Sequence, residues 1–149
     1  MNYLAHGCGF ADDPYFLAGT AVPDWLNVRD RKVRVRSLQA QPFFHHDDPP
    51  IAALAAGIVQ HHADDAWFHD SAVFNELCWQ LTVRCRDSLP PDAGFRPSFL
   101  GHILVEILLD AELLAARPAY GDDYYQALQA VDGQLIQQAV NGMASRGEC

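Results

Sequence analysis

Histidine and aspartate recur at a helical spacing in one segment of the chain. His61, Asp65 and His69 lie four residues apart, with His62 and Asp64 beside them. Four residues advance an α-helix by slightly more than one turn, so the three side chains would follow one stripe of a helix. An imidazole and a carboxylate so placed can bind one divalent cation. The alternative interpretation is a solvated polar stripe in which the histidines are incidental.

A second group repeats this spacing: His102, Glu106 and Asp110 interrupt an otherwise aliphatic run. Carboxylates among so many aliphatic neighbours are costly to bury unless they are paired or bound to metal. The polar face of an amphipathic helix is the alternative. His69 and His102 are also candidate catalytic residues, as general acid or base, if they hold no metal, because histidine titrates near neutral pH.

Three further features could join these groups. His6 stands in the opening hexapeptide, and Asp24 follows an apolar run. Alone, His6 could be an ordinary N-terminal histidine, and Asp24 could be a helix cap or turn residue. Five of the ten Lys and Arg residues fall between positions 29 and 36: Arg29, Arg31, Lys32, Arg34 and Arg36. Arginine suits bidentate contacts with phosphate or carboxylate. We therefore expect Arg31, Arg34 and Arg36 to bind substrate, with a solvated loop as the alternative.

The elements that must position these residues follow a helical apolar period. Asp48 and Ser98 are expected to cap helices, Pro118 to end one, and Gly142 to serve as a C-cap. Val33–Arg36 alternates like a strand, but four residues do not make a sheet. The predicted helices cover about 14–26, 51–69, 72–87, 98–116 and 122–141. The sequence thus predicts an all-α fold.

Composition bounds the remaining possibilities. With 149 residues, 50% of them hydrophobic and 19% charged, the chain is expected to form one globular domain over residues 1–149. A formal net charge of -9 argues against nucleic-acid binding. The N-terminus lacks the pattern of a signal peptide, and the apolar stretches are too short or too charged to span a bilayer. The four cysteines form no CxxC pair, as expected of reduced thiols in a cytoplasmic protein.

The order of these motifs resembles the acyl carrier protein phosphodiesterases. The resemblance rests on Met1–His6, Gly19 with Asp24, Gly57 with His61 and Asp65, the helix with Asp110, and Asn141–Arg146. It implies a helical bundle like that of the HD-type metal-dependent phosphohydrolases. The implied activity is hydrolysis of holo-acyl carrier protein to the apo form and 4′-phosphopantetheine. The alternative substrate is a related small phosphodiester. The implied cofactor is a divalent metal, usually Mn²⁺, with Zn²⁺, Fe²⁺ or Mg²⁺ as alternatives. The implied metal ligands are His6, Asp24, His61, Asp65 and Asp110.

The chain also departs from that family's pattern. His69 stands where an acidic residue is expected, Ala111 replaces a histidine, and His62 replaces an arginine; the sequence ends at Cys149, where family members continue. Two alternatives therefore stay open. One is a zinc-dependent phospholipase C or nuclease-like hydrolase, which Val22-Pro-Asp24 and the His102–Glu106 spacing resemble. The other is a non-catalytic relative that binds a phosphorylated ligand or a carrier protein.

Overall fold

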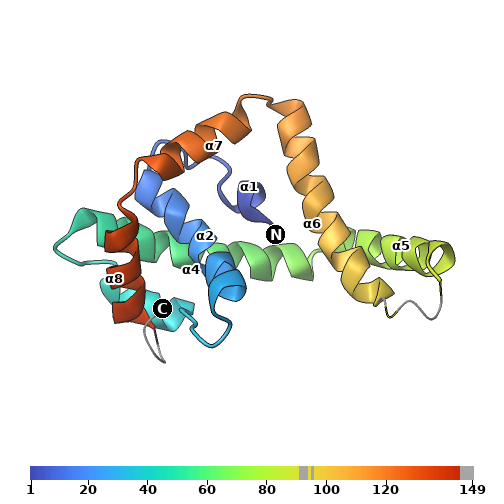
Figure 1. Cartoon of the computed structure of the whole chain (residues 1–149), viewed down its shortest axis with the longest axis horizontal. Helices are drawn as coiled ribbons and strands as arrows, with labels where there is room; N and C mark the ends of the chain where they lie inside the picture. Colours follow the sequence, from blue (N-terminus) through green and yellow to red (C-terminus); the bar gives the residue numbers. More distant parts are fainter. Residues whose placement is uncertain (91–93, 95, 145–149) are drawn as a thin grey trace.

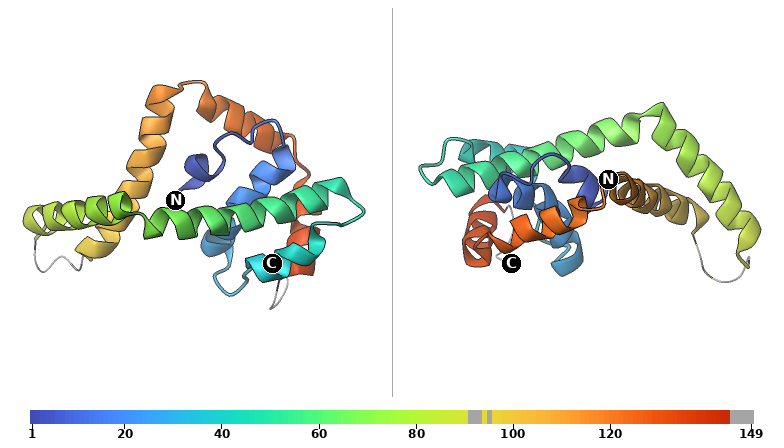
Figure 2. Two further views of the ribbon diagram at one scale, coloured as in Figure 1. Left: turned by 180° about the vertical axis from the view of Figure 1, so that it is seen from behind. Right: turned by 90° about the horizontal axis from the view of Figure 1, so that it is seen from above.

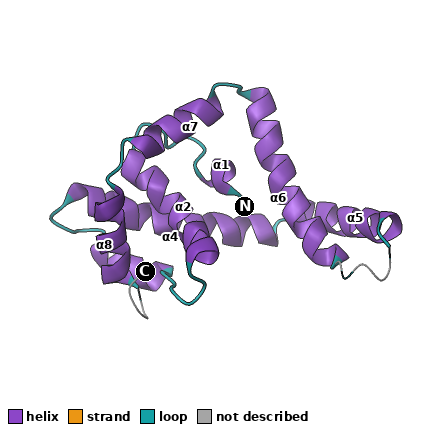
Figure 3. Cartoon of the chain, viewed as in Figure 1, coloured by secondary structure: helices purple, strands orange, loops and turns teal. Residues whose placement is uncertain are grey.

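The computed structural model describes residues 1–90, 94 and 96–144, and these form eight α-helices and one 3₁₀ turn with no strand among them (Figures 1 and 3). The all-α prediction is confirmed, whereas the HD-like arrangement stays a prediction. The helices are α1 (Tyr3–His6), α2 (Pro14–Arg29), α3 (Ser37–Ala40), α4 (Pro49–Asp70), α5 (Ala72–Ser88), α6 (Pro97–Ala116), α7 (Tyr120–Gln129) and α8 (Gly133–Met143), and the 3₁₀ turn η1 is Gln41–Phe43. Ser145 and Arg146, which are part of the segment that carries the resemblance, lie outside the described residues, and so does Cys149.

The crossing of α2 over α4 organises the molecule (Figure 1). At this crossing Gly19 faces Gly57, and the two backbones touch. A Cβ atom on Gly57 would lie 2.1 Å from the carbonyl oxygen of Phe16, and one on Gly19 would lie 2.2 Å from that of Leu54. Only glycine allows such a close approach, because any side chain would push the helices apart. The residues that follow Gly19 on α2 therefore lie against those that follow Gly57 on α4.

Two clusters of buried side chains surround this crossing. The larger one joins α2, α4, α8 and the segment before α3; its fully buried members include Val22, Val33, Val35, Leu54, Ile58, Val140 and Met143. The smaller one packs α1 against α2 and α7, and consists of Leu4, Leu17, Tyr120, Tyr124 and Ala127. The second cluster is what holds the four-residue helix α1, since so short a helix has little stability of its own.

Helices α5 and α6 pack as an antiparallel hairpin that reaches out from the rest of the molecule (Figure 2). Gly101 allows this close packing, since a Cβ there would lie 2.5 Å from the Thr82 hydroxyl oxygen. At the base of the hairpin, Ser71 is the N-cap of α5, and its side chain accepts a hydrogen bond from the Phe74 N–H. No described helix combines the length and the apolar character that crossing a bilayer requires.

Several predicted helix ends were wrong. The helix expected over 122–141 is two helices, because the Asp132 carboxylate accepts hydrogen bonds from the N–H groups of Gln134 and Leu135 and so starts α8 afresh. Gly142 is no C-cap, since α8 runs to Met143. Helix α6 begins at Pro97, one residue before the expected cap Ser98. Asp48 does stand at the N-cap of α4, as predicted, although its side chain makes no capping hydrogen bond.

Candidate metal centre

His61 lies on α4, one turn after the glycine crossing, and its ring is almost fully buried. Its Nδ1 lies 2.8 Å from the carbonyl oxygen of Thr20 on α2. Because a carbonyl can only accept, Nδ1 must carry the proton, and a neutral ring then presents the lone pair of Nε2. That atom faces an Asp65 carboxylate oxygen at 3.4 Å. A lone pair and a carboxylate oxygen repel each other unless a proton or a metal cation lies between them.

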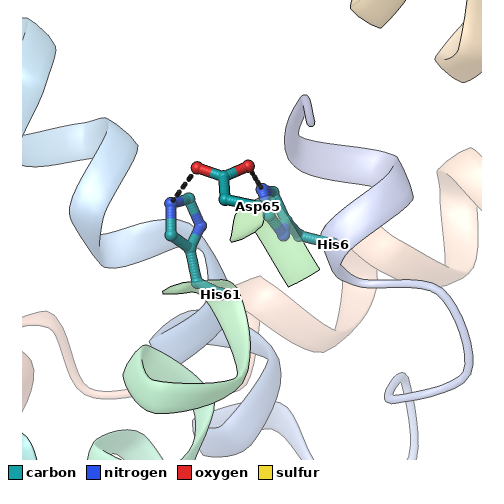
Figure 4. Close-up of side chains that lie close together, drawn as sticks. All are labelled: His6, His61 and Asp65. Carbon is teal, nitrogen blue, oxygen red and sulfur yellow. Dashed lines mark ion pairs between the residues drawn. The ribbon is translucent and has the colours of Figure 1, made fainter. Parts of the chain in front are cut away.

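His6 reaches the same place from α1. Its ring stacks on that of His61 with 4.0 Å between centroids, and its Nε2 lies 3.2 Å from the other Asp65 oxygen (Figure 4). The His6 side chain is buried, and its Nε2 faces Asp65 while its Nδ1 faces Asp64, but neither nitrogen makes a hydrogen bond of good geometry with a described residue. A buried polar atom without a well-formed hydrogen bond is costly. A cation bound beside Asp65 would satisfy it, so the residues present fit a metal.

Asp65 is the acidic member of this group. Burial alone would raise the pKa of its carboxyl group, but contacts with His6, His61 and the terminal ammonium of Met1 together hold the pKa well below its usual range. The carboxylate is therefore ionised at neutral pH. One ligand atom from each of His6, His61 and Asp65 lies within 4.8 Å of the other two, which is the arrangement that one cation needs.

Asp24 lies on α2 and lines a cavity that His61 and Asp65 line from α4. It makes no hydrogen bond or ion pair with another described residue. Burial raises the pKa of Asp24, and the nearby His61 and His6 oppose this shift. Asp24 is not among the residues whose ligand atoms lie within 4.8 Å of one another, so its expected role as a metal ligand stays a prediction.

The cavity has a volume of about 240 Å³. Part of its wall is formed by the basic segment, which is residues 29–36. Val33 and Val35 are buried in the larger core cluster, and the cavity is lined by Val35 together with its two neighbours, Arg34 and Arg36. His62 fixes this register, because its Nε2 lies 2.9 Å from the Val35 carbonyl oxygen, to which it donates. The third predicted arginine does not share the site: Arg31 is exposed, and its Nε donates to the Asn27 carbonyl oxygen at 3.3 Å.

Asp110 has a different position from that expected of a ligand. One of its carboxylate oxygens accepts a hydrogen bond from the Ala5 N–H at 2.9 Å, and the other accepts from the Leu4 N–H at 3.4 Å. Burial raises the pKa of Asp110, while these two hydrogen bonds lower it. The Tyr120 hydroxyl group donates to the Leu4 carbonyl oxygen at 2.6 Å. Asp110 and Tyr120 thus clamp α1 and position His6, and the structure does not gather Asp110 into the group around Asp65.

The two histidines expected to act as acid or base form a second group with Glu106. His69 Nε2 lies 3.3 Å, and His102 Nε2 3.1 Å, from the same Glu106 oxygen. Sequence reasoning noted Glu106 for its spacing from His102 but did not select it as a site residue. Asp64, which the sequence analysis noted only as a neighbour of the stripe, has a carboxylate oxygen 3.7 Å from His6 Nδ1. The signal for Glu106 was present, since an acidic residue four positions after a histidine repeats the His61–Asp65 pattern.

Comparisons with protein families, with curated proteins and with solved structures find no match to this chain.

Proposed function

We propose that the protein is a metal-dependent phosphodiester hydrolase. The observation that carries this proposal is the group formed by His6, His61 and Asp65, which opens onto a cavity lined by two arginines. Imidazole and carboxylate donors together suit Mn²⁺, Fe²⁺ or Zn²⁺ better than Mg²⁺, which prefers oxygen ligands. Mn²⁺ is the cation we expect, on the strength of the family resemblance.

Each side chain has a defined task in this proposal. His6, His61 and Asp65 hold the cation, and Asp24 completes the set from α2. The cation would supply two effects: a lower pKa for a bound water and neutralisation of charge on the phosphoryl oxygens. Arg34 and Arg36 bind the phosphoryl oxygens from the cavity wall, since a guanidinium group can donate two parallel hydrogen bonds to them.

The substrate we propose is the phosphodiester of holo-acyl carrier protein, with hydrolysis to the apo form and 4′-phosphopantetheine. The motif order supports this choice, and so does the position of the basic segment beside the cavity. Acyl carrier proteins are acidic, and this chain carries a net charge of -9. Productive encounter would therefore depend on the few cations around Arg34 and Arg36, because the average surface repels such a partner.

The test is turnover of bis-p-nitrophenyl phosphate and of holo-acyl carrier protein by the full chain with Mn²⁺. We expect both reactions to stop when EDTA removes the metal. Asp65→Asn should lower both rates by at least about 100-fold, because even the partners of metal ligands typically contribute 10–100-fold. Asp70→Asn is the matched control: Asp70 ends the same helix, is exposed, and should be replaceable without loss.

Folded protein that binds Mn²⁺ but hydrolyses neither substrate would contradict the proposal and favour the non-catalytic relative. Turnover of the small diester alone would retain the hydrolase and remove the carrier protein as its substrate. Equal losses in Asp65→Asn and Asp70→Asn would place the chemistry somewhere other than the group around Asp65.

A further inference from the structure

The side chains of His69, His102 and Glu106 form a compact cluster where three helices meet. His69 lies in the last turn of α4, whereas His102 and Glu106 are one turn apart on α6. One ligand atom from each residue lies within 4.8 Å of the other two. From this cluster we infer a second binding site for a divalent transition metal, adjacent to the group around Asp65.

One oxygen of Glu106 has more nitrogen neighbours than it can accept hydrogen bonds from, and a bound cation would resolve this. Three nitrogen atoms surround one Glu106 oxygen: His69 Nε2 at 3.3 Å, His102 Nε2 at 3.1 Å and the Met1 ammonium nitrogen at 3.3 Å. A carboxylate oxygen offers about two lone-pair sites, so three N–H groups cannot all donate to it well. With neutral imidazoles, both Nε2 lone pairs can instead turn to a metal ion that Glu106 also binds.

The rings are held in place by packing, as a binding site requires. Phe74 is buried, and its ring centroid lies 4.8 Å from that of His69 and 5.1 Å from that of His102. The Glu106 side chain is only 14% exposed, while those of His69 and His102 are 35% and 40% exposed. The anionic ligand is thus sheltered and the imidazole side is open to solvent. Two histidines and one glutamate with an open position form a ligand set that is typical of catalytic zinc sites.

The second site adjoins the first. Asp65 and His69 are one turn apart on α4, and Asp65 and Glu106 both contact the Met1 ammonium group. The carboxylates of the two clusters therefore face each other across a single positive charge, which bound cations would replace. In two-metal hydrolases, ions about 3.5–4 Å apart stabilise the attacking and leaving oxygens of a phosphoryl group. This catalytic consequence rests on the proposed function; metal binding at the cluster does not.

The experiment is a count of bound metal on the full chain. Chelated protein is titrated with Zn²⁺ by calorimetry, and the ions retained per chain are measured by elemental analysis. We expect two ions in the wild type, one in His102→Ala and one in His61→Ala. His45→Ala is the matched control, because His45 is exposed and lies outside both clusters. Glu106→Gln provides a second variant of the cluster that keeps the side-chain volume.

Adjacency has its own readout: Mn²⁺-loaded wild type should give the spectrum of two coupled Mn²⁺ ions in electron paramagnetic resonance, and each single-site variant the spectrum of an isolated ion. One ion in the wild type, unchanged in His102→Ala and Glu106→Gln, would overturn the inference. Two uncoupled ions would overturn the adjacency. Diesterase activity, measured separately, keeps the two proposals apart. Two ions without turnover refute only the hydrolase, and turnover with one ion refutes only the second site.

Discussion

Replacing Gly57 with alanine would test whether the crossing of α2 and α4 sets the geometry of the site. The added Cβ atom would lie 2.1 Å from the Phe16 carbonyl oxygen and 2.9 Å from the Gly19 Cα atom. The first distance is more than 1 Å shorter than an ordinary non-bonded contact of roughly 3.5 Å. Because both neighbours are backbone atoms within helix α2, no rotation of a side chain can relieve the clash, and the helices must move apart.

The magnitude follows from two opposing effects. Overpacking a core typically costs about 1–3 kcal/mol, and a contact with backbone belongs at the upper end of that range. Alanine in place of glycine within a helix returns about 1 kcal/mol. We therefore expect Gly57→Ala to lower the free energy of unfolding by about 2 kcal/mol. For a chain of this size that corresponds to a decrease in Tm of roughly 4–8 °C.

The site should be affected as well. His61 lies one turn beyond Gly57, and separation of the helices would lengthen its 2.8 Å contact with the Thr20 carbonyl oxygen. Losing this orienting hydrogen bond should weaken metal binding by about 10-fold or more. Stability is measured by thermal unfolding followed by circular dichroism, and metal affinity by calorimetry.

Gly142→Ala is the matched control for this substitution. Gly142 also lies within a helix, but a Cβ atom there would meet only the Phe43 ring, at an ordinary 3.9 Å. Alanine should therefore stabilise the protein by about 0.5–1 kcal/mol. If Gly57→Ala proved as stable as Gly142→Ala, with unchanged metal affinity, the argument from the close crossing would be refuted.

Two further predictions concern the residues around the cavity. Replacing both Arg34 and Arg36 with serine should raise KM for holo-acyl carrier protein roughly 10-fold or more, because the loss of even one hydrogen bond to a charged group costs about 1.5–3 kcal/mol. Arg31→Ser should leave KM nearly unchanged. Equal effects of all three arginines on KM in steady-state kinetics would contradict this prediction. Asp110→Asn, which retains an oxygen to accept from Ala5, should keep the metal stoichiometry and lose about 1 kcal/mol of stability; loss of one ion in elemental analysis of the folded variant would instead make Asp110 a metal ligand.

Much of the fold could be predicted from periodicity. The helices expected over 51–69, 72–87 and 98–116 correspond closely to α4, α5 and α6, because long apolar stripes are a strong local signal. The division of the last helix depends on one side chain, Asp132, which competes for backbone N–H groups. Helix α1 gave no periodic signal, since four residues are too few; Asp110 and Tyr120, more than 100 positions away, stabilise it.

The basic segment shows how a local pattern can be correct while its role depends on packing. Val33–Arg36 alternates as a strand would, yet no strand forms among the described residues. The alternation instead separates buried from less buried side chains: both valines enter the core, and the more exposed Arg34 and Arg36 line the cavity together with Val35. Nothing in the sequence distinguished these arginines from Arg31, because the difference arises from the contact between His62 and the Val35 carbonyl group.

The candidate site shows the limits of spacing along one helix. His61–Asp65 and His102–Glu106 are both four residues apart, and both pairs are in contact, at 3.4 Å and 3.1 Å. Asp110 continues the spacing of the second pair by another turn, yet its carboxylate turns to the N–H groups of α1. Spacing therefore predicts which donors share a stripe, but the third donor of each cluster comes from a different helix: His6 from α1 and His69 from α4. Where the stripe on α4 meets a helix that carries an imidazole, a metal site can form. Where the stripe on α6 meets the start of a helix, the same residue type becomes a cap.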